Sequence, residues 1–213
     1  MQLRPGQTLI EVLLSLAIIV VGILSLTSAL INAQVTAAAS TEAAIAVQLA
    51  REPIEAARFI RDSNWLEREN GAGTDFNDRL SSSTEANDYT ATYQWNAQLA
   101  NLDNAVRFNF DADDSSDSDT AIYRGPAGLF RHPPTTSLPG FDITIYSRYV
   151  TLFPICSSDG GLTETVLTGD GQDCGVDTQI GIQVVSLVMW SSRNSDRTVM
   201  LEERLYDWRY ATT

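Results

Sequence analysis

Hydrophobic positions divide the N-terminal part of the chain into two stretches. Residues 12–31 read VLLSLAIIVVGILSLTSALI, an apolar run without a charged residue. About 20 apolar residues of helix cross a bilayer, so this run predicts a membrane-spanning helix. From residue 32 to about 62 the sequence lacks glycine and is rich in alanine, and its apolar residues recur at helical spacing at Ala44, Val47, Ala50, Ile54, Ala57 and Ile60. That spacing predicts that an amphipathic helix continues the apolar one.

Two prolines bear on the limits of this long helix, which we expect over residues 7–63. Pro5 and Gly6 precede it, so a regular helix is expected to begin near Gln7 or Thr8. Pro53 lies inside it. Because proline has no backbone N–H and crowds the preceding turn, we expect the helix to be kinked or interrupted there.

Beyond Trp65 the pattern changes to strands and turns. YTATYQWNAQ at 89–98 alternates as a strand does, and three longer strands are predicted at 141–153, 179–190 and 198–210. The last two are separated by SSRNSDR at 191–197. An antiparallel sheet buries one face, and the amphipathic half of the helix is its expected cover. The predicted fold class is therefore α+β, with a β-rich head over residues 64–213.

The charge distribution suggests where the head lies. The 213 residues carry 27 Asp and Glu against 14 basic residues, all of them Arg, for a net charge of -13. Such a surface repels phosphate backbones, so general nucleic-acid binding is not expected. Arg4 precedes the apolar run and the next basic residue is Arg51. The positive-inside rule then keeps the N-terminus cytoplasmic and predicts an extracytoplasmic head.

Cys156 and Cys174 flank a stretch rich in Gly, Asp, Ser and Thr. This arrangement is typical of a disulfide that closes a loop in an oxidising compartment. Two independent buried thiols are the alternative, since cysteine also serves as a small apolar residue. A metal pair is disfavoured because the chain has no CxxC spacing and a single histidine, His132.

An acidic run, DADDSSDSD, offers carboxylates at the alternating spacing that calcium loops use: Asp111, Asp113, Asp117 and Asp119. An EF-hand loop requires glycine at its sixth position and glutamate at its twelfth, where this run has Ser116 and Ile122. The sequence therefore favours a solvated acidic loop over a calcium site. No other metal or cofactor is expected.

Catalytic residues are equally scarce. His132 lies in the turn-like RHPPTT, and no GxSxG elbow accompanies it. The sequence does not predict an enzyme.

Residues 6–26, GQTLIEVLLSLAIIVVGILSL, resemble the N-terminus of type IV prepilins and of the pseudopilins of type II secretion systems. That family has a short basic leader ending in glycine, a first mature residue that is usually Phe, then TLIEV and an apolar helix. Here Gly6 ends the leader and Gln7 replaces the Phe. The stretch VGILSL, with Gly22, resembles PilV-like minor pilins and the pseudopilin I group. The resemblance covers about the first thirty residues.

The resemblance implies that prepilin peptidase removes residues 1–6 by cutting between Gly6 and Gln7, and that Gln7 is then N-methylated. Segment 8–31 would anchor the chain in the membrane and later pack against other subunits, with Thr8 and Glu11 as assembly residues. In the family the matching glutamate pairs with the new amino group of a neighbouring subunit. An intramembrane carboxylate persists mainly with a partner. The alternative is that Glu11 reaches the headgroups as a favoured first-turn residue.

The resulting expectation is a structural subunit, a minor pilin or pseudopilin, of a type IV pilus or related filament. Its partners would be other pilin subunits, prepilin peptidase, the inner-membrane assembly machinery and, before assembly, membrane lipid. It would move from the inner membrane, with a cytoplasmic N-terminus, to an extracellular pilus or periplasmic pseudopilus. One alternative is a secreted protein with a signal peptide over residues 1–39 that ends near TAAAS. Another is a membrane-tethered extracytoplasmic binding domain.

Overall fold

A computed structural model describes residues 5–80, 90–95, 106–109, 120–124, 130–131, 146–168, 174–192 and 195–208. It contains a long N-terminal helix and an antiparallel sheet, which is the predicted α+β class. The chain divides into two compact units, Met1–Ala44 and Ile45–Thr213. The last part of the helix, from Ile45 onward, therefore belongs to the same unit as the sheet.

The helix, α1, runs from Pro5 to Glu69 and so exceeds the expected 7–63 at both ends. It begins at Pro5 because a proline in the first helical position loses no intrahelical bond. It ends in a Schellman motif around Gly71, whose φ is 80°. Gly71 N donates to Arg68 O at 3.1 Å and Ala72 N donates to Glu67 O at 3.1 Å. The left-handed glycine thus fixes the end of the helix.

Pro53 does not interrupt α1, so of the two outcomes expected there the interruption is wrong, while a kink stays a prediction. Proline lacks the N–H that would donate to the carbonyl of Leu49, four residues earlier. Arg148 of the sheet supplies a donor instead, with Nη1 at 3.1 Å from Leu49 O. The helical backbone therefore continues past Pro53, and the carbonyl of Leu49 accepts its hydrogen bond from a side chain outside the helix.

The central strand of the sheet is β5, Tyr146–Ser157. One edge of β5 pairs along its whole length with β7, Thr178–Ser192, and β7 pairs in turn with β8, Ser195–Tyr206. The other edge is shared by three short strands, β3 (Ala121–Arg124), β1 (Thr90–Trp95) and β6 (Thr165–Val166). β1 also pairs with β2 (Val106–Asn109), and β3 with β4 (Phe130–Arg131). Every pairing is antiparallel.

The limits of the three long strands differ from the sequence-based ones, and β8 ends at Tyr206 where residue 210 was expected. β7 and β8 extend until Ser192 pairs with Ser195, so most of the stretch 191–197 that was expected to separate them belongs to the two strands. β5 continues through Pro154 to Ser157. Pro154 O accepts a hydrogen bond from Leu167 N at 3.1 Å, on the edge away from β7. In an antiparallel strand N–H and C=O of one residue point to the same edge, so the missing N–H leaves the ladder with β7 intact.

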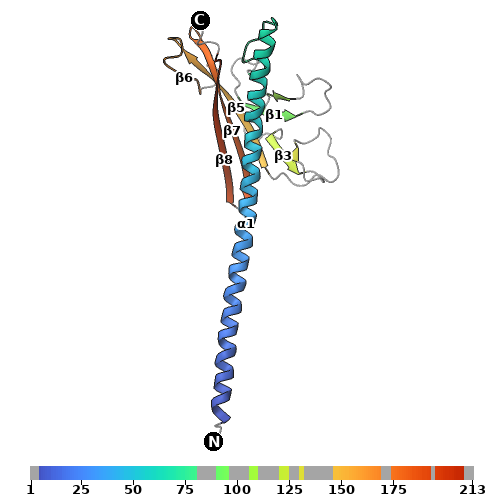
Figure 1. The fold of residues 1–213 in the computed structure, drawn as a ribbon, viewed down its shortest axis with the longest axis vertical. Helices are drawn as coiled ribbons and strands as arrows, with labels where there is room; N and C mark the ends of the chain where they lie inside the picture. Colours follow the sequence, from blue (N-terminus) through green and yellow to red (C-terminus); the bar gives the residue numbers. More distant parts are fainter. Residues whose placement is uncertain are drawn as a thin grey trace. The chain divides into compact units, whose positions relative to one another are not determined.

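The core lies between the sheet and the later turns of α1, which cross the face formed by β5, β7 and β8 (Figure 1). Alternate strand residues contribute to it, because a pleated strand directs every second side chain to one face. Its buried members are Ile54, Ala56, Ala57, Ile60, Trp65, Phe76, Leu80, Phe108, Val150, Leu152, Ile182, Val184 and Leu205. The predicted packing of the amphipathic half of the helix on the sheet is thus confirmed.

Asn64 fastens the loop that follows the helix. Its side chain is fully buried, and Nδ2 donates to Phe76 O at 3.0 Å and to Asp78 O at 2.7 Å. Its Oδ1 accepts from Arg79 Nη2 at 2.9 Å. Because a buried amide is stable only when its donors and acceptor are paired, these contacts fix the loop against the helix.

Cys156 and Cys174 form a disulfide, as the sequence predicted, and the alternative of two independent thiols is wrong. Their Cα atoms lie 5.5 Å apart and 18 positions separate them in sequence. The bond joins the end of β5 to the segment just before β7. It therefore fixes one end of the ladder between β5 and β7.

Candidate functional site

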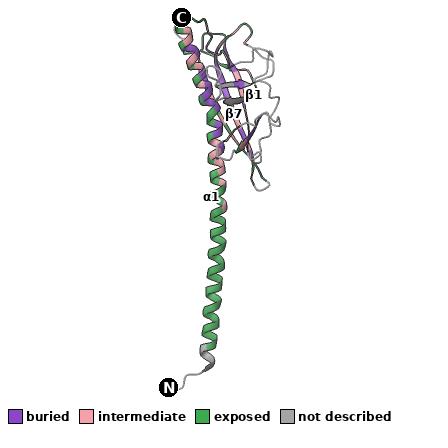
Figure 2. Cartoon of the chain, turned by 90° about the vertical axis from the view of Figure 1, so that its right-hand side faces the viewer, coloured by how far each residue is buried: buried purple, intermediate pink, exposed green. Residues whose placement is uncertain are grey.

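The most prominent surface of unit Met1–Ala44 is an exposed apolar helix. Every residue from 9 to 34 is exposed, and large side chains such as Leu9, Ile19 and Leu30 are 63%, 58% and 55% exposed. In Figure 2 this part of α1 is exposed throughout, whereas buried residues mark the later turns. By length and composition, α1 is the one described helix able to cross a membrane. A soluble monomer rarely exposes so much contiguous apolar surface, and the segment is compatible with membrane anchoring by its length and composition.

Hydroxyl groups in the apolar segment find partners within the helix. Ser15 Oγ donates to Glu11 O at 2.8 Å, Ser25 Oγ to Val21 O at 2.9 Å, and Thr27 Oγ1 to Ile23 O at 2.9 Å. Such bonds to the carbonyl one turn earlier remove the cost of placing a hydroxyl in an apolar environment. Glu11 is then the single charged residue between positions 9 and 41.

The predicted processing and assembly residues lie together at the start of α1. Gly6, Gln7 and Thr8 are helical, and only their backbone is described. Glu11 follows three positions after Thr8, one helical turn away, so the two residues share a helix face. Glu11 is exposed and lies beyond the first turn of α1, which begins at Pro5 and contains no acidic residue, so the helix macrodipole does not account for a carboxylate at this position. The sequence-predicted assembly residues thus occupy the first turns of an otherwise apolar surface.

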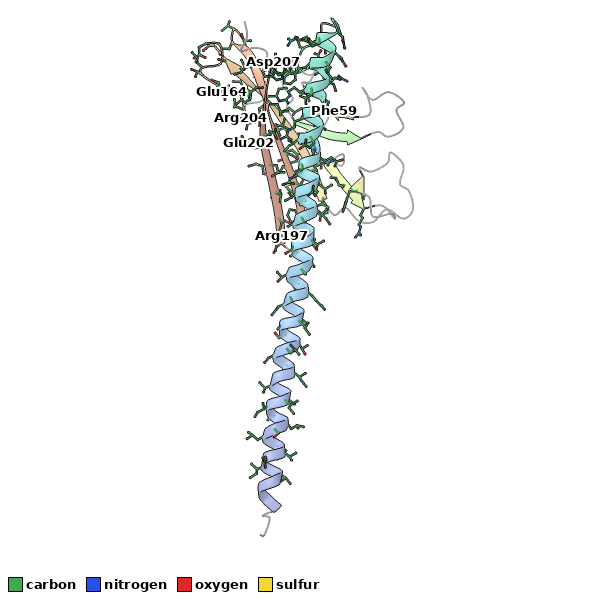
Figure 3. All side chains as sticks on the ribbon, in the orientation of Figure 1. Phe59, Glu164, Arg197, Glu202, Arg204 and Asp207 are labelled. Atoms are coloured by element: carbon green, nitrogen blue, oxygen red, sulfur yellow. A yellow bond between two sulfur atoms is a disulfide. The ribbon has the colours of Figure 1, made fainter. Side chains whose placement is uncertain are left out.

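One cluster of polar and charged groups, around Glu164, forms a local contact on the surface of the sheet. Glu164 Oε2 accepts from Arg204 Nη1 at 3.3 Å and from Tyr206 Oη at 2.9 Å, next to the exposed Glu202 (Figure 3). Partial burial, and then the bond to Glu164, raise the pKa of Tyr206, and the bond to Tyr206 raises the pKa of Arg204. Solvent-exposed pairs of this kind contribute little to stability. They form no nucleophile and base arrangement.

No group of three or more His, Cys, Asp or Glu side chains able to hold a metal occurs among the residues that the structure describes. The calcium candidates Asp111, Asp113, Asp117 and Asp119 lie outside the described ranges, as does His132. The calcium hypothesis therefore stays a prediction of the sequence.

No protein-family model, curated protein or solved structure matches the chain. The likeness of residues 6–26 to prepilins thus rests on the motif itself, and it remains a prediction.

Sequence reasoning missed Arg148, which joins the sheet to the helix. It is 4% exposed, and its Nη1 donates to Leu49 O and, at 2.6 Å, to Glu52 Oε2. Two sequence signals point to it in retrospect. Arg148 shares its strand parity with the apolar Tyr146, Val150 and Leu152, and a proline stands inside the helix that covers that face. A polar residue at a core position needs a partner, and an interior proline leaves one carbonyl without a donor.

Proposed function

We propose that this protein is a structural subunit of a type IV pilus or related filament, a minor pilin or pseudopilin that assembles through α1. The observation that carries the proposal is Glu11, a lone carboxylate near the start of an exposed apolar helix, separated by Thr8, Leu9 and Ile10 from a Gly6–Gln7 junction with the prepilin pattern. No catalytic role is proposed.

The placement of Glu11 has a physical explanation in such an assembly. A carboxylate inside the hydrocarbon region costs about 2.5–3.5 kcal/mol on insertion scales, so it is retained where a partner neutralises it. Cleavage after Gly6 would create an amino group on Gln7. In a bundle of apolar helices, the carboxylate of one copy and the amino group of its neighbour would attract strongly because little water screens them. Thr8, on the same face as Glu11, would lie in that contact.

The remainder of the segment suits two environments in succession. Because residues 9–34 are exposed on all sides, lipid can surround them before assembly and other helices can surround them afterwards. The disulfide Cys156–Cys174 fits an extracytoplasmic head, since such bonds persist in oxidising compartments. The implied partners are prepilin peptidase, the inner-membrane assembly machinery and other pilin subunits.

Processing is the first test. We would co-express the full chain with a prepilin peptidase, purify it from membranes, and determine its N-terminus and mass. The expected chain begins at Gln7, with or without one methyl group, and a Gly6→Val variant should keep its leader. A chain beginning near Ser40 would instead identify a secreted protein and would contradict the filament proposal.

Incorporation is the second test. Glu11→Ala is expected to insert into the membrane and fold normally but to be absent from sheared filaments, because the neighbour's amino group loses its counter-charge. Ser15→Ala, one turn away, is the matched control and should incorporate as the unmodified chain does. Equal incorporation of both variants would mean that Glu11 merely reaches the headgroups. If an unassembled Glu11→Ala chain keeps the ligand-binding function of the head, the protein is a membrane-tethered binding domain instead.

A further inference from the structure

The contact between α1 and β5 at Pro53 is more specific than apolar packing requires. Pro53 is buried and lies in the interior of a continuous helix. Its ring nitrogen has no hydrogen, so the carbonyl of Leu49 has no intrahelical donor from that position. Leu49 is itself buried, with 7% of its surface exposed, which keeps water from taking that place in the folded head.

Arg148 replaces the missing donor from across the core. Its side chain is 4% exposed, and Nη1 lies 3.1 Å from Leu49 O. The same Nη1 lies 2.6 Å from Glu52 Oε2, whose side chain is 47% exposed. Arginine carries five donors in a planar fork, so one buried group can serve a backbone carbonyl and a carboxylate together.

We propose that Pro53 and Arg148 form a latch that makes the helical state of residues 49–53 depend on docking against the sheet. While α1 lies on β5, Arg148 completes the hydrogen bonding of Leu49. When the helix leaves β5, residue 53 still offers no N–H to Leu49 O, and water replaces Arg148 as the partner of that carbonyl. The turn before Pro53 then lacks the intrahelical bond that would hold it, so it loses stability. Docking and local helix structure are then one event.

The latch also fixes the position of the helix along the sheet. Apolar contacts tolerate sliding by a residue better than a hydrogen bond of defined length does, because burial has no preferred direction. Displacing α1 by one residue would separate Arg148 from both Leu49 O and Glu52. The inference concerns unit Ile45–Thr213 alone and does not depend on the filament proposal.

A double-mutant cycle in the full-length chain in detergent tests the latch. The variants are Arg148→Met, Pro53→Ala and both together, and the measurement is amide hydrogen exchange of peptides over residues 45–60. Arg148→Met is expected to speed exchange there about tenfold, the effect of one lost buried hydrogen bond. In the Pro53→Ala chain, residue 53 has its own N–H, which can donate to Leu49 O. In that chain, adding Arg148→Met should change the exchange rate by less than about twofold. Equal effects in both backgrounds would overturn the proposal.

Glu52→Gln separates the carbonyl contact from the ion pair. If Arg148 acted only through Glu52, this variant would reproduce the effect of Arg148→Met, and that result would also reject the latch. Peptides over residues 9–31 serve as an internal control and should exchange alike in all variants. If Arg148→Met fails to fold, the Pro53→Ala/Arg148→Met chain should still fold. If both of these chains fail to fold, Arg148→Lys takes the place of Arg148→Met. The proposal is then rejected if adding Pro53→Ala to the Arg148→Lys chain does not slow exchange over residues 45–60.

Discussion

The two stretches of α1, residues 9–44 and 45–69, share one helical backbone and differ in what they contact. The first exposes almost every side chain, and its described hydroxyl contacts stay within the helix. The second buries Ala46, Ala50, Ala57 and Ile60 at helical spacing and adds charged contacts to the sheet, such as the bidentate pairing of Arg58 with Glu203. The difference shows that a helix can be continuous in structure while its two parts depend on different environments for stability.

Arg58 illustrates how the second stretch is held. Its Nε donates to Glu203 Oε1 at 2.7 Å, its Nη2 donates to Glu203 Oε2, and its Nη1 donates to Glu55 Oε1 at 2.6 Å. The bond to Glu203 is the main reason that the pKa of Arg58 is raised, with partial burial opposing it. No residue between 12 and 41 carries a charge that could form such a pair.

The largest effect is expected when the chain is divided at the boundary between its two units. Residues 45–213 alone are expected to dissolve and fold without detergent, because the exposed apolar helix is absent and the core cluster is complete. The full chain should require detergent or lipid. Gel filtration and circular dichroism in plain buffer provide the measurement. Aggregation of the fragment would show that residues 1–44 support the head.

A matched pair of isoleucines gives the next largest contrast. Ile60→Ala, at a side chain only 2% exposed, is expected to lower the free energy of unfolding of the head by about 2–5 kcal/mol. Ile19→Ala, at a side chain 58% exposed, should leave that free energy unchanged. Denaturant unfolding followed by tryptophan fluorescence measures both. A similar loss from the two substitutions would mean that the stretches are not separate in stability.

Removal of the disulfide tests whether this bond stabilises the head without affecting the first stretch of α1. Cys156→Ser with Cys174→Ser should destabilise the head by ~3 kcal/mol, as expected for a closed loop with a sequence separation of 18. Thermal unfolding of the oxidised chain, the reduced chain and the double variant gives the value. Reduction should leave the double variant unaffected, and membrane association should be equal in all three.

The smallest expected effect is a loss of stability in acid, caused by protonation of Asp159 in the turn after β5. Thr163 donates to both carboxylate oxygens of Asp159 through its hydroxyl and its N–H, and Ser157 adds a third bond. Chiefly the Thr163 hydroxyl lowers the pKa of Asp159 from 3.8 to about 2. A lowered pKa means that the ionised carboxylate stabilises the folded turn above pH 3.8 and that this contribution is lost as the pH falls to about 2.

Asp159→Asn removes this titration and provides the control. Between those two pH values the unmodified chain should lose slightly more stability than the variant, as measured by denaturant unfolding at each pH. Parallel losses would show that Asp159 does not contribute.

The sequence predicted the elements whose pattern reports burial directly. Apolar spacing located both stretches of α1, and alternation located β7 and β8, because side-chain periodicity and exposure are linked within one element. Helix-on-sheet packing and the disulfide were also predicted, but the specific polar contacts between elements were missed. At Pro53, the carbonyl left without a helical donor is bonded by Arg148, almost a hundred positions later in the sequence. At Pro154, β5 can continue because the backbone groups of this residue point to the edge of β5 that faces away from β7. For the candidate site, the apolar segment was predictable, but a partner for Glu11 would belong to another chain.

The outer edge of β8 bears on how copies of the protein behave when crowded. Within the described residues, β8 pairs with β7 alone, so one row of its backbone N–H and C=O groups faces outward. Unpaired strand edges can add strands from other molecules without limit. Exposed charges at Asp196, Glu202 and Arg204 are spread along this strand, and each would have to be matched across any new ladder. At high local concentration they disfavour edge-to-edge stacking of heads, so the sheet ends at β8 instead of serving as a template for amyloid-like growth.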